Sequence, residues 1–127
     1  MPDLFYLVES DKSFAEAVFD LPPVVQRAGF TVLNTYDFGE TLFRKGAEFD
    51  EECAVFEIGS ERYLAQLLAL DVRLALALPW RIAVFTEGSA TKIGVIWQAG
   101  ACEVAAPAAR LIAEIEQKLI LMVDETR

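Results

Sequence analysis

The chain has 127 residues, 54% hydrophobic and 24% charged, with a formal net charge of −9. This length fits one folded domain with a sizeable core, and the hydrophobic content excludes a disordered chain. The acidic balance argues against nucleic acid and anionic membranes as partners, because Lys and Arg supply most of the affinity for phosphates. The mean hydropathy of +0.34 is high for a soluble monomer and suggests a buried subunit interface.

The sequence contains no histidine. This excludes Ser-His-Asp and Cys-His catalytic arrangements and nearly all zinc sites. Cys53 and Cys102 form no CxxC motif, and two free thiols are favoured over a disulfide in a reducing compartment. No apolar run approaches the roughly 20 residues that span a bilayer, and the first residues lack the features of a signal peptide. We therefore expect a cytoplasmic protein.

The first predicted elements are a strand and a helix. Leu4–Glu9 alternates between apolar and polar residues, which is typical of a strand. Ser13 and Glu16 have the spacing of a capping box, so a helix is expected to begin there. Within that helix Pro22–Pro23 predicts a kink or a restart, because proline removes a helix donor. Gly29 is expected to end the helix.

A second strand and a short helix are expected next. Phe30–Asp37 reads as a strand with Val32 and Tyr36 on one face and Leu33 on the other. Phe38–Lys45 reads as a helix. The acidic run at residues 48–52 lacks the glycine and the ligand spacing of a calcium loop, so a solvated loop is favoured over a metal site.

The central part of the chain repeats this alternation. Cys53–Ile58 is a predicted strand, and Ser60 is a good N-cap for a helix over Glu61–Leu70. Val72–Leu78 is ambiguous, because its alternating large residues favour a strand while its alanines favour a helical turn. We expect it to be extended.

A β-hairpin follows within the stretch Leu74–Trp97, around which the other elements are expected to pack. Its strands are predicted at Trp80–Thr86 and Thr91–Gln98, joined by the turn signal at residues 87–89. Ala99–Ala106 is expected to be a loop. The helix that begins at Pro107 is apolar nearly all round at its end, so it is either sandwiched within the domain or in contact with a second subunit.

The expected element order is therefore β-α-β-α-β-α-β-β-α. It favours an α+β fold with a mostly antiparallel sheet and helices packed on one face. No strand is followed by a glycine-rich phosphate loop. The sequence predicts no cofactor.

Several short segments, in this order, resemble one known family, the domain of unknown function 302 family. They are Tyr6–Phe14, Gly29–Phe30, Val55–Ile58, Leu70–Asp71 and Leu78–Pro79. The resemblance implies a TATA-binding-protein-like α+β fold, often as a homodimer, without an established activity.

The chain departs from that family at two places. Members usually carry Cys-Asn-Pro after the third strand and Leu-Pro-Cys before the hairpin, whereas this chain has Gly59-Ser60-Glu61 and Leu78-Pro79-Trp80. Thiol exchange and soft-metal binding need the thiolate. Such chemistry is therefore not transferred to this chain.

The two departures suggest a packing hypothesis. Gly59 frees space at one junction, and the Trp80 indole is expected to fill the volume of the missing cysteines. The alternative is that Trp80 forms the wall of an apolar ligand pocket, with Arg81 or Ser60 as a polar handle. Packing is favoured.

Glu57 is the most interesting carboxylate, because it lies inside an apolar strand. If buried it would have a raised pKa, which suits a general acid. An outward position on a one-sided sheet is favoured, since alternation groups it with Cys53 and Val55. Tyr36 and Tyr63 are interpreted as core or interface aromatics.

Three arginines, Arg62, Arg73 and Arg81, are candidates for an anion-binding group near the Gly59 turn. Scattered solubilising charges are the favoured interpretation. The sequence thus predicts no catalytic and no metal-binding residue, and its candidate ligand-binding residues are Glu57, Gly59, Ser60, Trp80 and Arg81.

The leading functional hypothesis is a non-enzymatic homodimeric module that binds a partner or a small molecule. Its site would lie where the third strand, its helix and the hairpin meet. The alternative hypothesis is an enzyme that uses carboxylates such as Glu57 and Asp37 together with a tyrosine.

Overall fold

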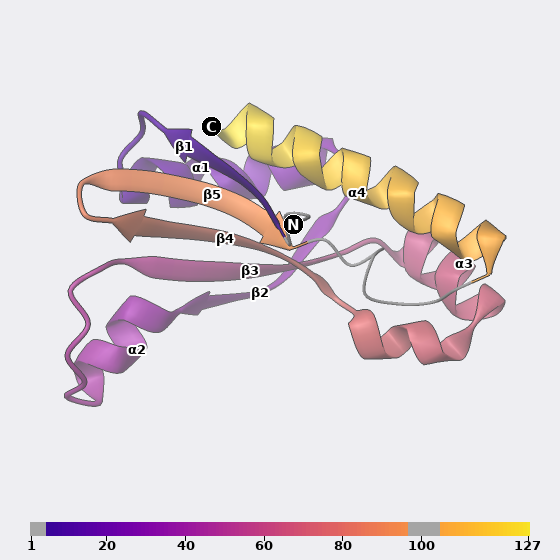
Figure 1. Ribbon diagram of the computed structural model, residues 1–127, viewed down its shortest axis with the longest axis horizontal. Coiled ribbons are helices and arrows are strands. Elements are labelled where there is room, and N and C mark those ends of the chain that lie inside the picture. Colours follow the sequence, from indigo (N-terminus) through magenta and orange to yellow (C-terminus); the bar gives the residue numbers. More distant parts are fainter. Residues whose placement is uncertain (1–4, 97–104) are drawn as a thin grey trace.

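The computed structural model describes residues 5–96 and 105–127. It contains one antiparallel sheet of five strands in the order β1-β5-β4-β3-β2 (Figure 1). The predicted element order and the α+β class are confirmed. The elements are β1 (Phe5–Ser10), α1 (Phe14–Arg27), β2 (Thr31–Asp37), α2 (Phe38–Arg44), β3 (Cys53–Gly59), α3 (Glu61–Leu70), the 3-10 helix η1 (Val72–Ala77), β4 (Trp80–Glu87), β5 (Ala90–Ile96) and α4 (Ala106–Thr126).

The predicted hairpin is present as β4 and β5, and β4 is the central strand of the sheet. A two-residue turn joins them, and Gly88 adopts a φ of 62° there. Glycine takes this conformation without steric cost, which explains why the turn forms at this position. The predicted ends of the first and last strands at Leu4 and residues 97–98 lie outside the described residues, as does most of the predicted loop with Cys102.

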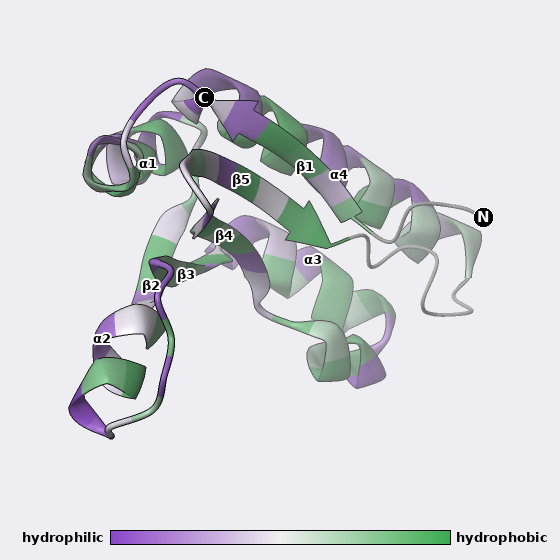
Figure 2. Ribbon diagram, turned by 60° about the vertical axis from the view of Figure 1, so that its left-hand side comes forward, coloured by the Kyte–Doolittle hydropathy of each residue, from purple (hydrophilic) through white to green (hydrophobic). Residues whose placement is uncertain are grey.

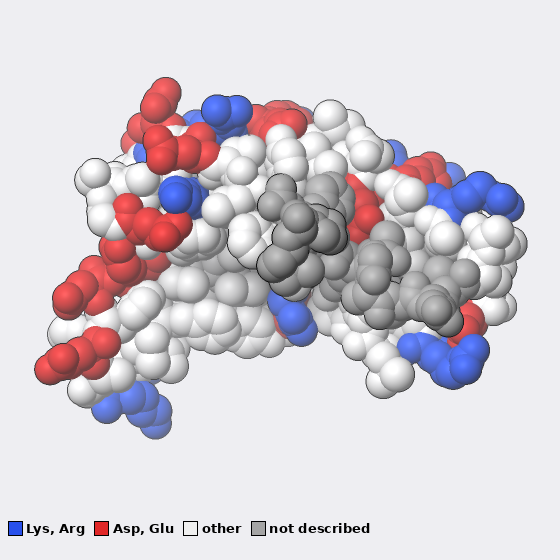
Figure 3. Space-filling view, viewed as in Figure 1, with Lys and Arg blue, Asp and Glu red and all other residues white. Residues whose placement is uncertain are grey.

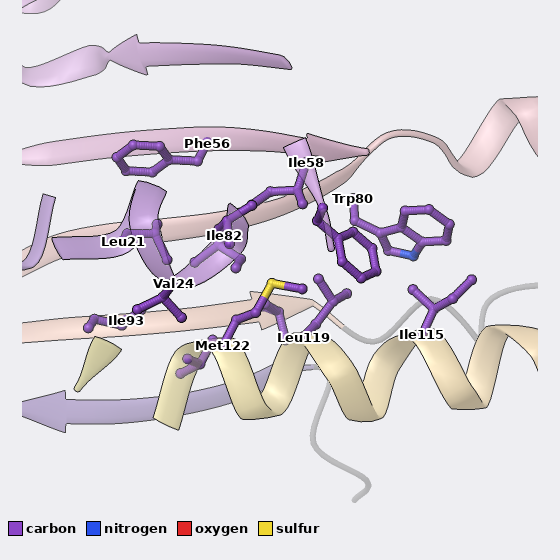
Figure 4. Close-up of a cluster of buried hydrophobic side chains, with 14 of the residues drawn as sticks. Leu21, Val24, Phe56, Ile58, Trp80, Ile82, Ile93, Ile115, Leu119 and Met122 are labelled. Carbon is purple, nitrogen blue, oxygen red and sulfur yellow. The ribbon is translucent and has the colours of Figure 1, made fainter. Parts of the chain in front are cut away.

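Three helices, α1, α3 and α4, supply the core on one face of the sheet. Figure 4 shows Ile115, Leu119 and Met122 pointing from α4 toward the side chains of the sheet. Trp80 and Phe56 are the largest of the fully buried side chains in this core, and both are 2% exposed. Among the described helices none is long and apolar enough to cross a membrane.

The fourth helix, α2, is set apart from this layer. It has no buried residue and projects with the ends of β2 and β3 away from the other helices (Figure 2). Phe43 is 80% exposed on it. The prediction that helices cover one face of the sheet therefore holds for α1, α3 and α4.

Two local predictions differ from the structure. Of the kink or restart predicted at Pro22–Pro23, the restart is absent, because α1 runs unbroken from Phe14 to Arg27. Residues 72–77 form the 3-10 helix η1 instead of an extended segment. Asp71 caps it, since the Asp71 Oδ1 atom accepts a hydrogen bond of 3.0 Å from the Arg73 backbone N–H. This cap favours the helical turn that the alanines allow.

A β-bulge changes which side chains of β2 share a face. The register shifts between Val32 and Asn34, so that Val32 pairs with the buried Ile58 while Tyr36 pairs with the half-buried Val55. These partners lie on opposite faces of β3. The prediction that Val32 and Tyr36 share a face was therefore wrong, because the extra residue reverses the alternation beyond it.

The last residues of α4 are fastened to β1 and to the segment that follows it. The Ser10 hydroxyl donates to the Arg127 carbonyl over 2.7 Å, and the Lys12 ammonium donates to the Thr126 carbonyl over 2.8 Å. The Tyr6 hydroxyl donates to the Asp124 carboxylate over 2.7 Å. The first strand is thus held by the hairpin on one side and by the end of α4.

Candidate functional site on the open face of the sheet

The sheet has one face that α1, α3 and α4 do not cover, which we call the open face. Strand register places alternate residues of each strand on it. One row crosses the whole sheet through directly paired positions. This row consists of Leu7, Gly94, Ala83, Val55 and Tyr36.

The middle of this row forms the floor of a shallow trough of about 470 Å³. Gly94 and Ala83 keep the floor low, while Phe5, Ile96 and Phe85 form its apolar sides. The β1 backbone also needs Gly94, because a Cβ atom there would lie 2.7 Å from the Tyr6 carbonyl oxygen. Figure 3 shows a largely uncharged surface over β3 and β4, beside α2.

A polar cluster lies next to the trough. The Tyr36 hydroxyl donates a hydrogen bond of 2.9 Å to one oxygen of Glu57. The Arg81 Nε atom lies 3.8 Å from the other oxygen of Glu57. The Glu57 side chain is 15% exposed and that of Arg81 is 58% exposed, so the guanidinium is the group that this cluster presents to solvent.

Electrostatics at this cluster act mainly on the tyrosine. The hydrogen bond to Glu57, and then the charge of that carboxylate, raise the pKa of Tyr36 above its usual value of 10.0. A raised pKa keeps the hydroxyl protonated at neutral pH, and it makes Tyr36 a weaker acid. The cluster therefore holds the carboxylate in place and does not supply a proton donor tuned to neutral pH.

The five predicted ligand-binding residues do not form one site. Glu57 and Arg81 are paired on the open face. Ser60 caps α3, where its hydroxyl oxygen accepts a hydrogen bond of 3.4 Å from the Tyr63 backbone N–H. Trp80 points into the core on the covered face. Adjacent residues of a strand point to opposite faces, so Trp80 and Arg81 lie on opposite sides of the sheet.

Gly59 has its own neighbour on the open face. A Cβ atom at this position would lie 2.8 Å from the Leu33 side chain, which reaches it from the bulge in β2. Trp80 is buried beside Ile58, its register partner, as the packing hypothesis requires. However, the space at Gly59 is occupied by Leu33 and not by the indole.

The indole nitrogen of Trp80 has no hydrogen-bond partner among the described residues. Trp80 does not line the trough, whereas Arg81 does. The core position of Trp80 thus agrees with the packing interpretation. The pocket-wall alternative receives no support from the trough.

The three candidate anion-binding arginines have separate partners. Arg73 makes hydrogen bonds of 3.0 Å and 2.9 Å to the two Asp71 oxygens. The Arg62 guanidinium lies 5.5 Å from the centre of the Tyr63 ring. Arg81 lies next to Glu57. Each of the three guanidinium groups thus has its own nearby partner, which favours the interpretation as scattered charges.

The carboxylates and tyrosines considered for an enzyme also lie in different places. Asp37 caps α2 by accepting a hydrogen bond of 2.9 Å from the Glu40 backbone N–H. Tyr63 is 4% exposed and stacks on Phe30 in the core. Of these named candidates, Tyr36 and Glu57 come together. Tyr36 also stacks on Phe38 with 5.7 Å between ring centres.

The acidic run at residues 48–52 contributes to the hairpin end. Glu51 accepts hydrogen bonds from the Thr86 hydroxyl and from the Gly88 backbone N–H. Within residues 5–96 and 105–127, no group of three acidic or cysteine side chains is placed to hold a metal ion. Cys53 is a free thiol whose pKa is raised, first by burial and then by the charge of Asp37.

Sequence reasoning missed the apolar residues that make the open face. Phe5 and Ile96 are 53% and 54% exposed. Alternation indicates which face of its own strand each residue occupies. It does not show that β1 and β5 are neighbours, because this pairing joins distant parts of the chain. Their signal was the presence of large apolar residues on both faces of the same strands.

The chain matches the family described as Domain of unknown function DUF302 over residues 6–126. A crystal structure of an uncharacterised conserved DUF302 protein from Bacillus stearothermophilus is similar in fold, with a TM-score of 0.92 and 24% sequence identity over 98% of each chain. No curated protein matches the chain. Because the family match extends over almost all of the sequence, this chain belongs to the DUF302 family.

Proposed function

We propose that this chain is a non-catalytic binding or regulatory module that acts as a homodimer in the cytoplasm. The observation that carries the proposal is the apolar open face of its sheet. Six large apolar side chains on or beside that face are between 36% and 54% exposed. They are Phe5, Leu7, Leu33, Tyr36, Phe38 and Ile96.

The area of this apolar surface is close to what a stable dimer uses. With side chains of roughly 150–250 Å² each, the six expose on the order of 500 Å². This lies in the upper part of the range of about 300–600 Å² that the largest apolar patch of a typical monomer covers, and such patches are often functional. A specific interface buries about 800 Å² on each partner, of which the rim is polar. The high mean hydropathy of the chain supports the same conclusion.

The charges of the open face argue against nucleic acid as the partner. Arg81 and Lys92 are accompanied there by Glu9, Glu57 and Glu87. A phosphate backbone needs an excess of basic groups. A small molecule fits less well than a protein surface, because the trough is shallow and open while ligand pockets enclose most of their ligand.

The hydrogen bond between Tyr36 and Glu57 favours a second candidate function, an enzyme with carboxylate and tyrosine acid–base groups. Against it stand the raised pKa of Tyr36 and the capping role of Asp37. A ligand retained by the wild type in native mass spectrometry and lost in Glu57→Gln would support this candidate.

Light scattering of the purified protein at micromolar concentration tests the main proposal. The expected mass is twice the chain mass of 14.1 kDa. Native mass spectrometry of the same sample reports any ligand that remains bound. A mass of one chain across the micromolar range would refute the homodimer.

A further inference from the structure

The outward-facing residues of β4 would complement the same residues of a second β4 strand that runs in the opposite direction. In order they are Arg81, Ala83, Phe85 and Glu87. The first is basic and the last acidic, while a small residue and a large residue lie between them. Resting on the proposed homodimer, we propose that a second copy packs face to face on the open face, with the two β4 strands antiparallel.

A two-fold axis produces this arrangement if it lies between the two sheets and crosses β4 at the level of Val84. It places Arg81 opposite Glu87 of the second copy and Ala83 opposite Phe85 of the second copy. Each contact then occurs twice, as a symmetric dimer interface requires. Facing sheets lie about 10 Å apart, a gap that a Phe ring over an alanine fills.

The charges that β4 presents outward have opposite signs at its two ends. The Arg81 and Glu87 side chains are each 58% exposed, and both have a partner within the chain that is less exposed. Arg81 is held only loosely by Glu57, with 3.8 Å between Nε and the nearest carboxylate oxygen. Its guanidinium is therefore available to a carboxylate that approaches the open face.

The neighbouring strand β5 is compatible with the same axis, which also crosses β1 at Val8 and places Leu7 opposite Glu9. Val84 and Ile93 are register partners, so the axis crosses β5 at Ile93. Reversal about this residue places Gly94 opposite Lys92 and Ile96 opposite Ala90 of the second copy. A small residue thus faces a long one at both positions. The trough over Gly94 and Ala83 becomes the recess that receives side chains of the second copy.

Charge reversal on β4 tests this register in the full chain. Arg81→Glu and Glu87→Arg each create like charges opposite one another, and each is expected to raise the dissociation constant of the dimer at least about tenfold. The double variant R81E/E87R restores opposite charges across the interface. It is expected to bind within about threefold of the wild type. Sedimentation equilibrium in about 0.15 M salt measures the constants, and circular dichroism confirms folding of each variant.

Arg44→Glu is the matched control, because Arg44 is exposed on α2 and its Nε atom also lies 3.8 Å from a carboxylate oxygen, that of Glu40. It changes the net charge equally and is expected to leave the dissociation constant unchanged. Ala83→Phe tests the fit of the side chains, since the new ring and Phe85 of the second copy would meet in one recess. This variant is expected to abolish the dimer.

The outcomes separate the two proposals. A monomeric wild type overturns the proposed homodimer, and the register with it. If the wild type is dimeric, three results would overturn the register alone. They are no effect of the single reversals, no rescue in the double variant, or an Arg44→Glu variant that weakens the dimer as strongly as the single reversals do. Rescue by the double variant supports the register, because both local pairs within the chain stay disrupted in it.

Discussion

The Tyr36 hydroxyl contacts the Glu57 carboxylate on the open face. Among the described residues, Tyr36 is the only tyrosine that both has a shifted pKa and contacts a candidate site residue. The folded pKa of Tyr36 lies above its usual value of 10.0. An unfolded chain therefore loses this proton first as the pH rises above 10. The stability that the bond contributes is present at neutral pH and is lost at more alkaline pH.

Replacing Glu57 with Gln should lower the pKa of Tyr36 toward its usual value, because the carboxylate that accepts the hydrogen bond of the hydroxyl and repels the tyrosinate is removed. Titration of the tyrosine absorbance between pH 9 and 12 measures the change, and Tyr36→Phe assigns the transition. Asp124→Asn is the matched control, since Asp124 raises the pKa of Tyr6 in the same manner. It should move the Tyr6 transition alone. An unchanged midpoint in Glu57→Gln would contradict the contact.

Two glycines on the open face have different neighbours. A Cβ atom at Gly94 would meet the Tyr6 carbonyl oxygen, which is backbone of the paired strand β1. A Cβ atom at Gly59 would meet a methyl group of Leu33, which is the end of a flexible side chain. Backbone cannot move without loosening the sheet, whereas a side chain can rotate.

Gly94→Ala is therefore expected to destabilise the fold by about 1–3 kcal/mol, and Gly59→Ala by less. Urea unfolding followed by circular dichroism gives both free energies, and hydrogen exchange of β1 amides shows whether this strand is loosened in Gly94→Ala. Equal stability of the two variants would mean that β1 does not lie as close to β5 as the structure shows.

Local signals predicted most of the elements. Ser13 and Glu16 form the predicted capping box, with both hydrogen bonds at 3.1 Å. Such caps are contacts between neighbours in sequence, so they can be read directly. The bulge at Leu33 could not be read, because it depends on how β2 pairs with β3. The 3-10 helix η1 was missed because a short alternating run fits either state.

The candidate site was predicted in part for the same reason. Alternation placed Glu57 on the outer face of β3, which the structure bears out. Trp80 and Arg81, which the sequence grouped as candidate ligand-binding residues, lie on opposite faces of the sheet, since neighbours in a strand point to opposite faces. The trough could not be predicted, because its floor joins β3, β4 and β5 through long-range pairing.

For the whole molecule, the net charge of −9 opposes the proposed association. Two copies repel over distances that salt shortens, since the Debye length is about 30 Å at 0.01 M and about 3 Å at 1 M. Charges inside an interface are screened much less. The balance of these effects sets the salt dependence of a dimer.

We expect salt to strengthen the dimer, with the dissociation constant falling several-fold between 0.01 M and 1 M sodium chloride, as the long-range repulsion is removed. Sedimentation equilibrium across this range measures it. Neutralising two exposed carboxylates on α4, far from the open face, should reduce the dependence; Glu114→Gln with Glu125→Gln does this. A dimer that weakens steadily with salt would contradict the expectation.

The attachment of the end of α4 to β1 has a consequence for synthesis of the protein. The strand β1 pairs with β5, and side chains of β1 and of the segment after it donate hydrogen bonds to residues 124, 126 and 127. The contacts that fasten β1 to α4 can therefore form only after the last of these residues has been synthesised. Until then β1 is held in the sheet by its pairing with β5, without its hydrogen bonds to the end of α4.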